Sequence, residues 1–293
     1  MADSSNVIDL HIHTTVSDGT DTPEELLEKV RDAGISVFSV TDHDAVMAAD
    51  RIRPLLTEHD PRFIPGVEFS CRDEKGSYHI LGYGFDPGSK AIRNVTGLGH
   101  AFRIKKLLAR LEYLEKTFGF SFPEEEIAAL ISLDNPGKPH IGNLMVKYGY
   151  AATKEQAINK YINRVYFANE YVRPEQAIEG ITGAGGVPVL AHPFYGSGND
   201  LILGEEMEKR LKRLIGYGLG GIEAFYSGFP AKLRKEALSI AEKLDLAVTA
   251  GSDYHGSNKL IRLGDTGLEE ETKIPERLRR FLERVTGNIG NPG

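Results

Sequence analysis

The sequence of 293 residues predicts an α/β protein in which the strands of a parallel sheet alternate with helices. Seven short apolar or β-branched runs recur along the chain, and most are followed by a stretch with the apolar spacing of a helix. With 41% hydrophobic and 26% charged residues, the composition is that of a folded globular protein rather than a disordered one. The length fits about two domains of roughly 150 residues, or one barrel with an insertion.

The predicted strands are short and rich in β-branched and aromatic residues. They are Val7–His13, Val37–Thr41, Phe63–Phe69, Tyr78–Gly84, Val187–Ala191, Gly221–Tyr226 and Ala247–Gly251. The carboxyl ends of parallel strands meet at one mouth of a barrel, so side chains at these ends are expected to lie close together.

Helices are predicted between these strands from their start and stop signals. The clearest follows Thr22, a good N-cap, with Pro23 in the first helical position and Gly34 after the last turn. Helical spacing of apolar residues predicts the others. They are Ala45–Glu58, Arg173–Thr182, Glu205–Tyr217 and Pro230–Leu244.

Residues 89–169 interrupt the alternation, because their periodic segments are all helical. These segments are Lys105–Lys116, Pro123–Ile131, His140–Tyr148 and Lys154–Asn163. The predicted organisation is therefore a discontinuous α/β domain, residues 1–88 and 170–286, with an all-helical insertion domain, residues 89–169. A flexible tail, residues 287–293, is expected to follow.

Charge and composition exclude several classes of partner. Thirty-five Lys and Arg residues against 42 Asp and Glu residues give a net charge of −7, which argues against binding duplex nucleic acid. No apolar run reaches the 18 or so residues that span a membrane, and the amino terminus lacks a signal-peptide pattern. We expect a cytoplasmic protein without an obligatory protein partner, and a small anionic ligand fits the composition.

Histidine gives the strongest functional signal. Six of the nine histidines lie at or just beyond predicted strand ends, and Asp18, Glu68 and Asp253 lie nearby. A single histidine is more often a packing residue than a ligand, but so many ionisable groups at one mouth would repel without a cation. The six are His11, His13, His43, His79, His192 and His255. Strand alternation also places His11 and His13 on one face.

The segments DLHIHTTVSDGT, TDHD, GVEFS, AHP and GSDYHG resemble, in order and spacing, the motifs of the PHP (polymerase and histidinol phosphatase) superfamily. This resemblance implies a distorted (β/α)7 TIM-like barrel. The insertion and the segment Gly137–Ile141 are similar to stand-alone phosphoesterases that act on nucleoside 3',5'-bisphosphates and short RNA ends. The expected substrate is therefore a small nucleotide or a short oligoribonucleotide.

The resemblance also implies three divalent metal ions. His11, His13, Glu68 and Asp253 would hold the first, Glu68, His79 and His192 the second, and Asp18, His43 and His255 the third. Mixed nitrogen and oxygen ligands suit manganese, iron or zinc better than magnesium or calcium. A hydroxide bridging the first two ions is expected to attack a phosphate monoester. Glu68, Asp253 and His192 are then the catalytic residues, as ligands of the ions that would hold that hydroxide.

Cationic residues of the insertion are candidates for holding the substrate. Lys138 and His140 lie in a loop fixed by Gly and Pro, and Asn143 follows one helical turn after His140. Arg103 is a further candidate, for which the alternative is a place on the solvated basic face of its helix. Tyr195 is a candidate for stacking on a base. Family members usually have Arg where this sequence has Lys138, so a point charge replaces a bidentate phosphate contact.

Several residues and functions stay open at this point. Asp9, Asp42 and Asp44 are candidates for orienting imidazoles, Asp44 being equally a helix cap, and Glu223 has no settled orientation. Cys71 is expected to pack as a small apolar group. A histidinol-phosphate-type phosphatase would share the metal chemistry. An amidohydrolase commonly uses a lysine at a strand end, which this sequence lacks, and a non-catalytic metal-binding module would be expected to have lost ligands.

Overall fold

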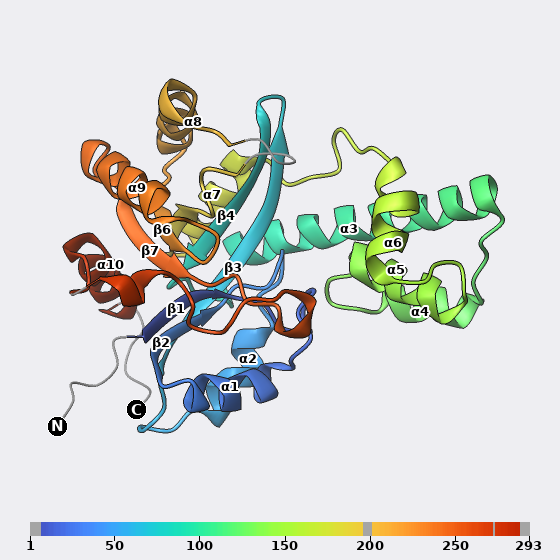
Figure 1. Cartoon of the computed structure of the whole chain (residues 1–293), viewed down its shortest axis with the longest axis horizontal. Coiled ribbons are helices and arrows are strands. Elements are labelled where there is room, and N and C mark those ends of the chain that lie inside the picture. The colour runs from blue at the N-terminus through green and yellow to red at the C-terminus, as the bar shows by residue number, and fades with distance from the viewer. Residues whose placement is uncertain (1–6, 196–200, 272, 288–293) are drawn as a thin grey trace.

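The computed structural model describes residues 7–195, 201–271 and 273–287, and shows an α/β fold with one mixed sheet of seven strands in the order β1 to β7 (Figure 1). The strands are β1 Val7–Ile12, β2 Ile35–Val40, β3 Arg62–Asp73, β4 Gly76–Tyr83, β5 Val187–Leu190, β6 Gly221–Tyr226 and β7 Ala247–Gly251. The α/β class and all seven predicted strands are confirmed. The predicted tail lies outside the described residues except for Gly287.

The prediction of a parallel sheet is wrong for β4, which runs antiparallel to both β3 and β5. Only Glu74 and Lys75 separate β3 from β4, and a two-residue hairpin cannot return the chain for parallel pairing. The sequence pattern predicts the end of the third strand at Phe69, whereas β3 continues to Asp73. As a result, the first half of β4 lies at the edge where the parallel strands end.

Backbone hydrogen bonds connect the first strand with the segment after the last. The amide of Asp253 donates to the carbonyl of His11 at 2.8 Å, and the amide of His13 donates to the carbonyl of Tyr254 at 2.9 Å. Residues from opposite ends of the chain are thereby held side by side, and two histidines are fixed against the loop that follows β7.

Helix α1, Pro23–Asp32, forms as its sequence predicts. The Thr22 hydroxyl accepts from the Glu25 amide while the Glu25 carboxylate accepts from the Thr22 amide, a complete capping box. Leu26, Leu27 and Val30 form its buried stripe. Three further helices match predicted ones within about two residues. They are α7 Pro174–Gly183, α8 Gly204–Gly216 and α9 Ala231–Lys243.

Two differences from the predicted helices have clear causes. The predicted helix Ala45–Glu58 is only α2, Ala48–Ile52, followed by a 3-10 turn, Arg53–Leu55, in which Pro54 cannot continue the α-helical hydrogen bonds. Helix α10, Glu276–Gly287, was not predicted, although Leu278, Phe281 and Val285 keep helical spacing and are buried. It packs against β7.

Between β4 and α7 the described chain contains helices only. Its helices are α3 Lys90–Phe118, α4 Glu124–Ile131, α5 Lys138–Lys147, α6 Lys154–Gln156, a π-helical turn Ala157–Tyr161 and a 3-10 turn Ile162–Arg164. Apolar side chains from α3, α5 and the following turns, among them Leu107, Ile141 and Ile162, form a buried cluster of their own. Figure 1 shows α4, α5 and α6 at the end of α3 that lies away from the sheet. Helix α3 packs on α7.

The remaining buried apolar residues form two clusters on the sheet, one of which includes Cys71, whose predicted packing role is confirmed. No helix within the described ranges is both long enough and apolar enough to cross a lipid bilayer.

The close approach of β7 to β1 gives a testable prediction. A Cβ on Gly251 would lie 2.2 Å from the Cβ of His11 and 2.6 Å from Oε1 of Glu223. We expect Gly251→Ala to lower the free energy of unfolding by about 1–3 kcal/mol, the usual cost of overpacking, as measured by urea denaturation. Gly97, exposed on α3 with nothing near its missing Cβ, is the control. Gly97→Ala should instead raise this free energy by about 0.5–1 kcal/mol.

Candidate metal centre

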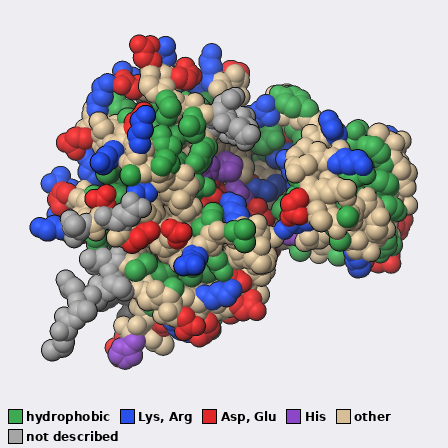
Figure 2. All heavy atoms as spheres, viewed as in Figure 1, with side chains coloured by type: hydrophobic (Ala, Val, Ile, Leu, Met, Phe, Trp, Pro, Cys, Tyr) green, Lys and Arg blue, Asp and Glu red, His purple; other side chains and the backbone are tan. Residues whose placement is uncertain are grey.

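The nine side chains that the sequence predicts as metal ligands lie together at one edge of the sheet. Figure 2 shows histidines gathered in the hollow between the part of the molecule that holds the sheet and the helices α4 to α6. The nine are His11, His13, Asp18, His43, Glu68, His79, His192, Asp253 and His255, called the cage below. The structure therefore brings together groups separated by up to 244 positions in the chain, counted from His11 to His255.

The strand β1 positions the deepest part of the cage. His11 lies within the strand and His13 follows it, and both side chains are completely buried. Leu10 and Ile12, on the other face, are buried in the apolar clusters. Alternation along a strand therefore directs two imidazoles into the cage while the aliphatic side chains fix the strand.

Glu68 lies at the centre of the cage, with five imidazole nitrogens 2.9–3.4 Å from its two carboxylate oxygens. The five belong to His11, His79 and His192, on the side of Oε1, and to His13 and His43, on the side of Oε2. A carboxylate that presents its oxygens to two sets of imidazoles has the arrangement of a ligand that bridges two cations.

Asp253 closes the buried side of the cage. Its Oδ1 lies 3.6 Å from Nε2 of His11 and 3.4 Å from Nε2 of His13. Its Oδ2 accepts from the hydroxyl of Tyr226 at 3.0 Å and from the ammonium of Lys259 at 2.6 Å. One oxygen is thus directed at the imidazoles while two donors hold the other.

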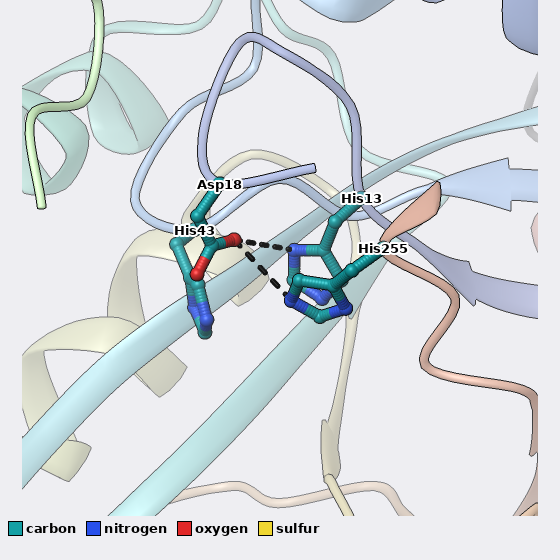
Figure 3. Close-up of side chains that lie close together, drawn as sticks. All are labelled: His13, Asp18, His43 and His255. Carbon is teal, nitrogen blue, oxygen red and sulfur yellow. Dashed lines mark ion pairs between the residues drawn. The ribbon is translucent and has the colours of Figure 1, made fainter. Parts of the chain in front are cut away.

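A second group forms around Asp18, which the turn after β1 carries over the cage (Figure 3). Its Oδ1 lies 3.3 Å from Nε2 of His255 and 3.8 Å from Nδ1 of His13, and His43 lies beside them. Asn258 holds the turn in place, because its side-chain amide donates to the Asp18 carbonyl at 2.7 Å. Lys154 of α6 in turn donates to Asn258.

Three sets of ligand atoms lie close enough to hold an ion, each within 4.8 Å. They are His13, Asp18, His43 and His255; His11, His13 and Asp253; and His43, Glu68 and His79. The sets overlap the three predicted ones without matching them. Glu68 is absent from the set of His11, His13 and Asp253, and His43 takes the place of His192 beside Glu68 and His79. His13 also joins the set of Asp18. His13 and His43 each lie between neighbouring sets.

Burial distinguishes two sides of the cage. The side chains of His11, His13 and Glu68 are at most 1% exposed, whereas those of Asp18 and His79 are 24% and 35% exposed. Among the described residues, Asp18 and His79 therefore form the most exposed side of the cage, called the rim below. His43 and His192 lie at intermediate depth.

The cage residues shift one another's pKa values. Burial opposes the charge of Glu68, but His79, His43 and His11 hold the pKa of its carboxyl well below the ordinary value. Burial also opposes the charge of His11, while Glu223, Glu68 and Asp253 raise the pKa of this imidazole well above its ordinary value. A cation that binds His11 must displace a proton, since metal ligands bind in their deprotonated form.

Besides the types of side chain present, a further observation shows that the cage residues fit divalent cations. Nε2 of His11 and Nε2 of His13 are fully buried, and within the described chain neither has a hydrogen-bond partner. Buried imidazole nitrogens without a partner are costly, and coordination to a metal ion would satisfy both. Both nitrogens face Glu68 and Asp253, which supply the negative charge.

Glu223 of β6 supports the cage from behind, a role that the sequence pattern alone does not predict. Its Oε1 accepts from Nδ1 of His11 at 2.9 Å, and its Oε2 accepts from the amide of His192 at 2.8 Å. One carboxylate thus fixes the ring of one cage residue and the backbone of another. The Ile-Glu-Ala pattern of a buried strand was the available signal, since a fully buried glutamate requires polar partners.

Asp9, Asp42 and Asp44, predicted to orient imidazoles, have no hydrogen bond to an imidazole ring among the described residues. Asp9 accepts from Ser252, and Asp42 from Thr14 and Ser17. They instead fix the loops that carry cage residues.

The alternative prediction for Asp44, a helix cap, is wrong, because the N-cap of α2 is Met47. Asp44 accepts from the Ser70 amide at 3.0 Å and from Nε of Arg103 at 2.6 Å. Asp44, His192 and Asp253 all adopt positive φ, at 51°, 27° and 60°. Such backbone strain in non-glycine residues is concentrated at functional sites.

The predicted substrate residues lie on the helical side of the hollow. Arg103 is ion-paired with Asp44 and donates to Ser70 Oγ at 3.1 Å. Lys138 donates to Asn163 at 2.7 Å, and Nδ1 of His140 accepts from the Gly137 amide, so this ring also caps α5.

The two remaining candidates differ in exposure. Asn143 is exposed one turn along α5. Tyr195 is half-buried and uses its hydroxyl to donate to the Gly228 carbonyl at 2.8 Å. Its ring packs against those of Phe229 and Tyr226.

Comparison with known proteins identifies the family. The model of the PHP domain matches residues 9–172, more than half of the chain. The chain belongs to the PHP family. The matched range contains six cage residues, from His11 to His79, so the resemblance seen in the sequence motifs is confirmed.

Members of the PHP family match over nearly the whole chain. The 3',5'-nucleoside bisphosphate phosphatase of Chromobacterium violaceum is 29% identical over 97% of this chain and 98% of its own length. The 5'-3' exoribonuclease Rnm of Salmonella typhimurium is 31% identical over 88% of each chain. A solved structure from Bifidobacterium adolescentis, described as a candidate metal-dependent phosphoesterase, is 29% identical with a TM-score of 0.77, covering 94% of this chain and 96% of its own.

The contacts of Glu223 with two cage residues predict a loss of metal affinity on substitution. Glu223→Gln leaves one acceptor oxygen where two are used, so His11 and the His192 amide cannot both be held. We expect the affinity for manganese or zinc to fall about 10- to 100-fold, as for other residues that orient metal ligands, measured by competition with a chelating indicator.

Asp73→Asn is a matched control, because Asp73 is a buried carboxylate that pairs with Arg213 outside the cage. This variant should lose stability but keep its metal affinity. A folded Glu223→Gln protein with unchanged affinity would show that Glu223 does not position the cage.

Proposed function

We propose that this PHP protein is a metal-dependent phosphoesterase that hydrolyses phosphate monoesters of small nucleotides, such as nucleoside 3',5'-bisphosphates, or of short RNA ends. The observation that carries the proposal is Glu68 among five imidazoles, beneath a rim that is open toward cationic helices. Its relatives include a nucleoside bisphosphate phosphatase and an exoribonuclease, which both act on phosphate esters of nucleotides.

In this proposal the cage holds three divalent ions. His11, His13, Glu68 and Asp253 hold the first, Glu68, His79 and His192 the second, and Asp18, His43 and His255 the third. The mixture of imidazole and carboxylate ligands favours manganese, iron or zinc. Bound cations of this kind lower the pKa of a water molecule and neutralise charge that develops on phosphoryl oxygens.

The chain's own residues then orient and enclose the reaction. Glu68 presents its two oxygens to two sets of imidazoles, and Asp253 is fixed by Tyr226 and Lys259, so neither carboxylate needs to reorganise during catalysis. Lys138 and His140, across the rim, are positioned to hold a substrate phosphate. Lys138 supplies the point charge of an ammonium rather than the planar, two-donor contact of an arginine guanidinium. This favours phosphate affinity over selectivity for one phosphate geometry.

The wider architecture belongs to the same proposal. A distorted (β/α)7 barrel, residues 1–88 and 170–286, would carry the cage, and its closure is supported by the backbone hydrogen bonds between β1 and residues 253 and 254. An insertion domain, residues 89–169, would cover the open rim, and the separate apolar cluster of its helices supports this division. The cytoplasmic location stays a prediction from the sequence.

Phosphate release from a substrate panel tests the proposed substrate. With manganese, iron or zinc present, kcat/KM for 3',5'-adenosine bisphosphate should exceed that for histidinol phosphate and p-nitrophenyl phosphate by at least about tenfold, since charge-assisted contacts to a nucleotide phosphate contribute that much. Release from histidinol phosphate alone would instead indicate the histidinol-phosphate type of phosphatase. Hydrolysis of an amide without phosphate release would indicate an amidohydrolase.

Glu68→Gln tests the bridging role. The amide cannot present an anionic oxygen to each set of imidazoles, so both bound metal, measured by elemental analysis, and turnover should fall, the latter by about 100-fold or more. Glu24→Gln, which removes an exposed partner of Arg51, should change neither. A Glu68→Gln enzyme with full metal content and activity would contradict the assignment.

A further inference from the structure

The turn that carries Asp18 is held from two sides. On the side of β1, the carbonyl of Thr14 accepts from the amides of Ser17 and Gly19 at 3.0 and 2.9 Å. On the other side, the side-chain amide of Asn258 donates to the carbonyl of Asp18 at 2.7 Å. Because the Asp18 side chain is 24% exposed, the position of its carboxylate depends on these backbone contacts more than on close packing.

Asn258 also contacts the backbone of His255. It closes the 3-10 turn Gly256–Asn258, and its main-chain amide donates to the carbonyl of His255 at 3.3 Å. One residue thus binds two of the predicted ligands of the third ion, Asp18 through its side chain and His255 through its main chain. The facing ligand atoms, Oδ1 of Asp18 and Nε2 of His255, lie 3.3 Å apart. A displacement of Asn258 would change this distance.

The turns 17–20 and 256–258 fit closely against each other. The amide of Ser257 donates to Oγ1 of Thr20 at 2.9 Å. A Cβ on Gly256, whose φ is 65°, would lie only 1.9 Å from the same oxygen. Only a glycine at position 256 therefore lets the two turns meet, and hydrogen bonds set their relative position.

Lys154 connects Asn258 with the helical insertion. It is the first residue of α6, and its ammonium donates to Oδ1 of Asn258. Within the described ranges, this neutral amide is the only hydrogen-bond partner of the Lys154 ammonium. A cation at the oxygen of an amide polarises the group and strengthens the hydrogen bond that its nitrogen donates. Lys154 therefore strengthens the hydrogen bond from Asn258 to Asp18.

Lys154 is itself packed tightly against α5. A Cβ on Gly142 of α5 would lie 3.1 Å from Cγ of Lys154 and 3.3 Å from its carbonyl oxygen. The same helix begins with Lys138 and carries His140, two of the candidate substrate residues. A displacement of α5 would therefore also move Lys154 and the hydrogen bond that it donates.

The insertion also reaches the remaining predicted ligand of the third ion, His43. Arg103 of α3 donates to Oγ of Ser70 at 3.1 Å, and this oxygen lies 3.3 Å from Nδ1 of His43. The surroundings of all three predicted ligands are thus in contact with insertion helices. By contrast, the side chains that hold the deeper ligands His11 and Asp253 come from β6 and from the loop after β7. They are Glu223, Tyr226 and Lys259.

We propose that Lys154 and Asn258 are positioning residues through which the helical insertion controls how tightly the third ion is held. The first two ions are held by the sheet and its loops alone. The third ion is held at full affinity only while α6 lies against the turn of Asp18. This inference rests on the three-ion cage of the proposed function and adds a control of its metal content.

Equilibrium dialysis of the full chain against manganese tests the positioning role. We expect the wild type to bind three equivalents. Lys154→Met should bind two with wild-type affinity and the third about 10- to 100-fold more weakly, the usual effect of removing a residue that orients a metal ligand. Lys154→Arg keeps a cationic donor and should restore most of the lost affinity. Lys147→Met removes an exposed lysine of the insertion that pairs with Glu126, and as the matched control it should bind like the wild type.

Asn258→Asp separates the two hydrogen bonds of this side chain. The carboxylate still accepts from Lys154, so the insertion stays attached. It cannot donate to the carbonyl of Asp18, however, and places an oxygen opposite that carbonyl. We expect the affinity for the third ion to fall at least as far as in Lys154→Met. An unchanged affinity for all three ions would show that Asn258 does not position Asp18.

Hydrogen exchange measures the coupling from the side of the insertion. A coupling free energy between two sites is reciprocal. The third equivalent of manganese should therefore slow amide exchange in residues 154–164 of the wild type, and should not do so in Lys154→Met. A substitution that only destabilises the fold would instead speed exchange throughout the chain and weaken all three ions equally, and this result would overturn the positioning role.

The remaining outcomes distinguish this inference from the proposed function. A Lys154→Met protein that binds all three ions like the wild type would overturn the inference and leave the proposed function intact. A wild type that binds fewer than three ions would overturn the three-ion cage, and the inference with it. If Lys154→Met loses the third ion but the wild type releases phosphate from no substrate, the inference is supported and the proposed function is overturned.

Discussion

Burial of the Glu68 carboxylate among imidazoles is the constraint on which the rest of the structure depends. A buried charge needs compensation, and five histidines from separate parts of the chain approach it within 3.4 Å. The antiparallel hairpin of β3 and β4 brings His79 to Glu68 across neighbouring strands. Glu223 and the glycine at position 251 then allow β1 and β7 to approach closely enough to complete the buried side.

Negative and positive charge are divided between the two parts of the molecule. The carboxylates of the cage belong to the sheet and its loops, whereas the cations that face the rim belong to α3 and α5. Asp44 joins the two parts, because it binds the Ser70 amide of β3 and the guanidinium of Arg103. The rim thus lies between carboxylates and imidazoles on one side and cationic side chains on the other, an arrangement suited to the proposed hydrolysis of a phosphate ester.

The sequence predicted local features well and long-range ones poorly. The capping box of α1 and the strand alternation at His11 and His13 follow from short-range rules. The gathering of six histidines is long-range, but it follows from the rule that parallel strands end at one mouth. The antiparallel direction of β4 follows from where β3 ends and β4 begins. The ends of strands are the feature that hydrophobic periodicity predicts least reliably. The partners of Glu223 and Asp44 come from other elements, so no local pattern could assign them. Helix α10 was missed although its Leu278, Phe281 and Val285 spacing was visible.

The uninterrupted helical stretch between β4 and α7 has a consequence for how such proteins diversify. No cage residue comes from residues 90–164, whereas the candidate substrate residues Arg103, Lys138 and His140 do. The outer helices bury an apolar cluster of their own, while Ile92 and Val95 at the start of α3 pack in the cluster of the sheet. Exchanging the part of the stretch that follows these first turns would change the side chains that face the rim and keep all nine cage residues. Such an exchange would also have to replace the contact between Lys154 and Asn258, which supports the Asp18 turn.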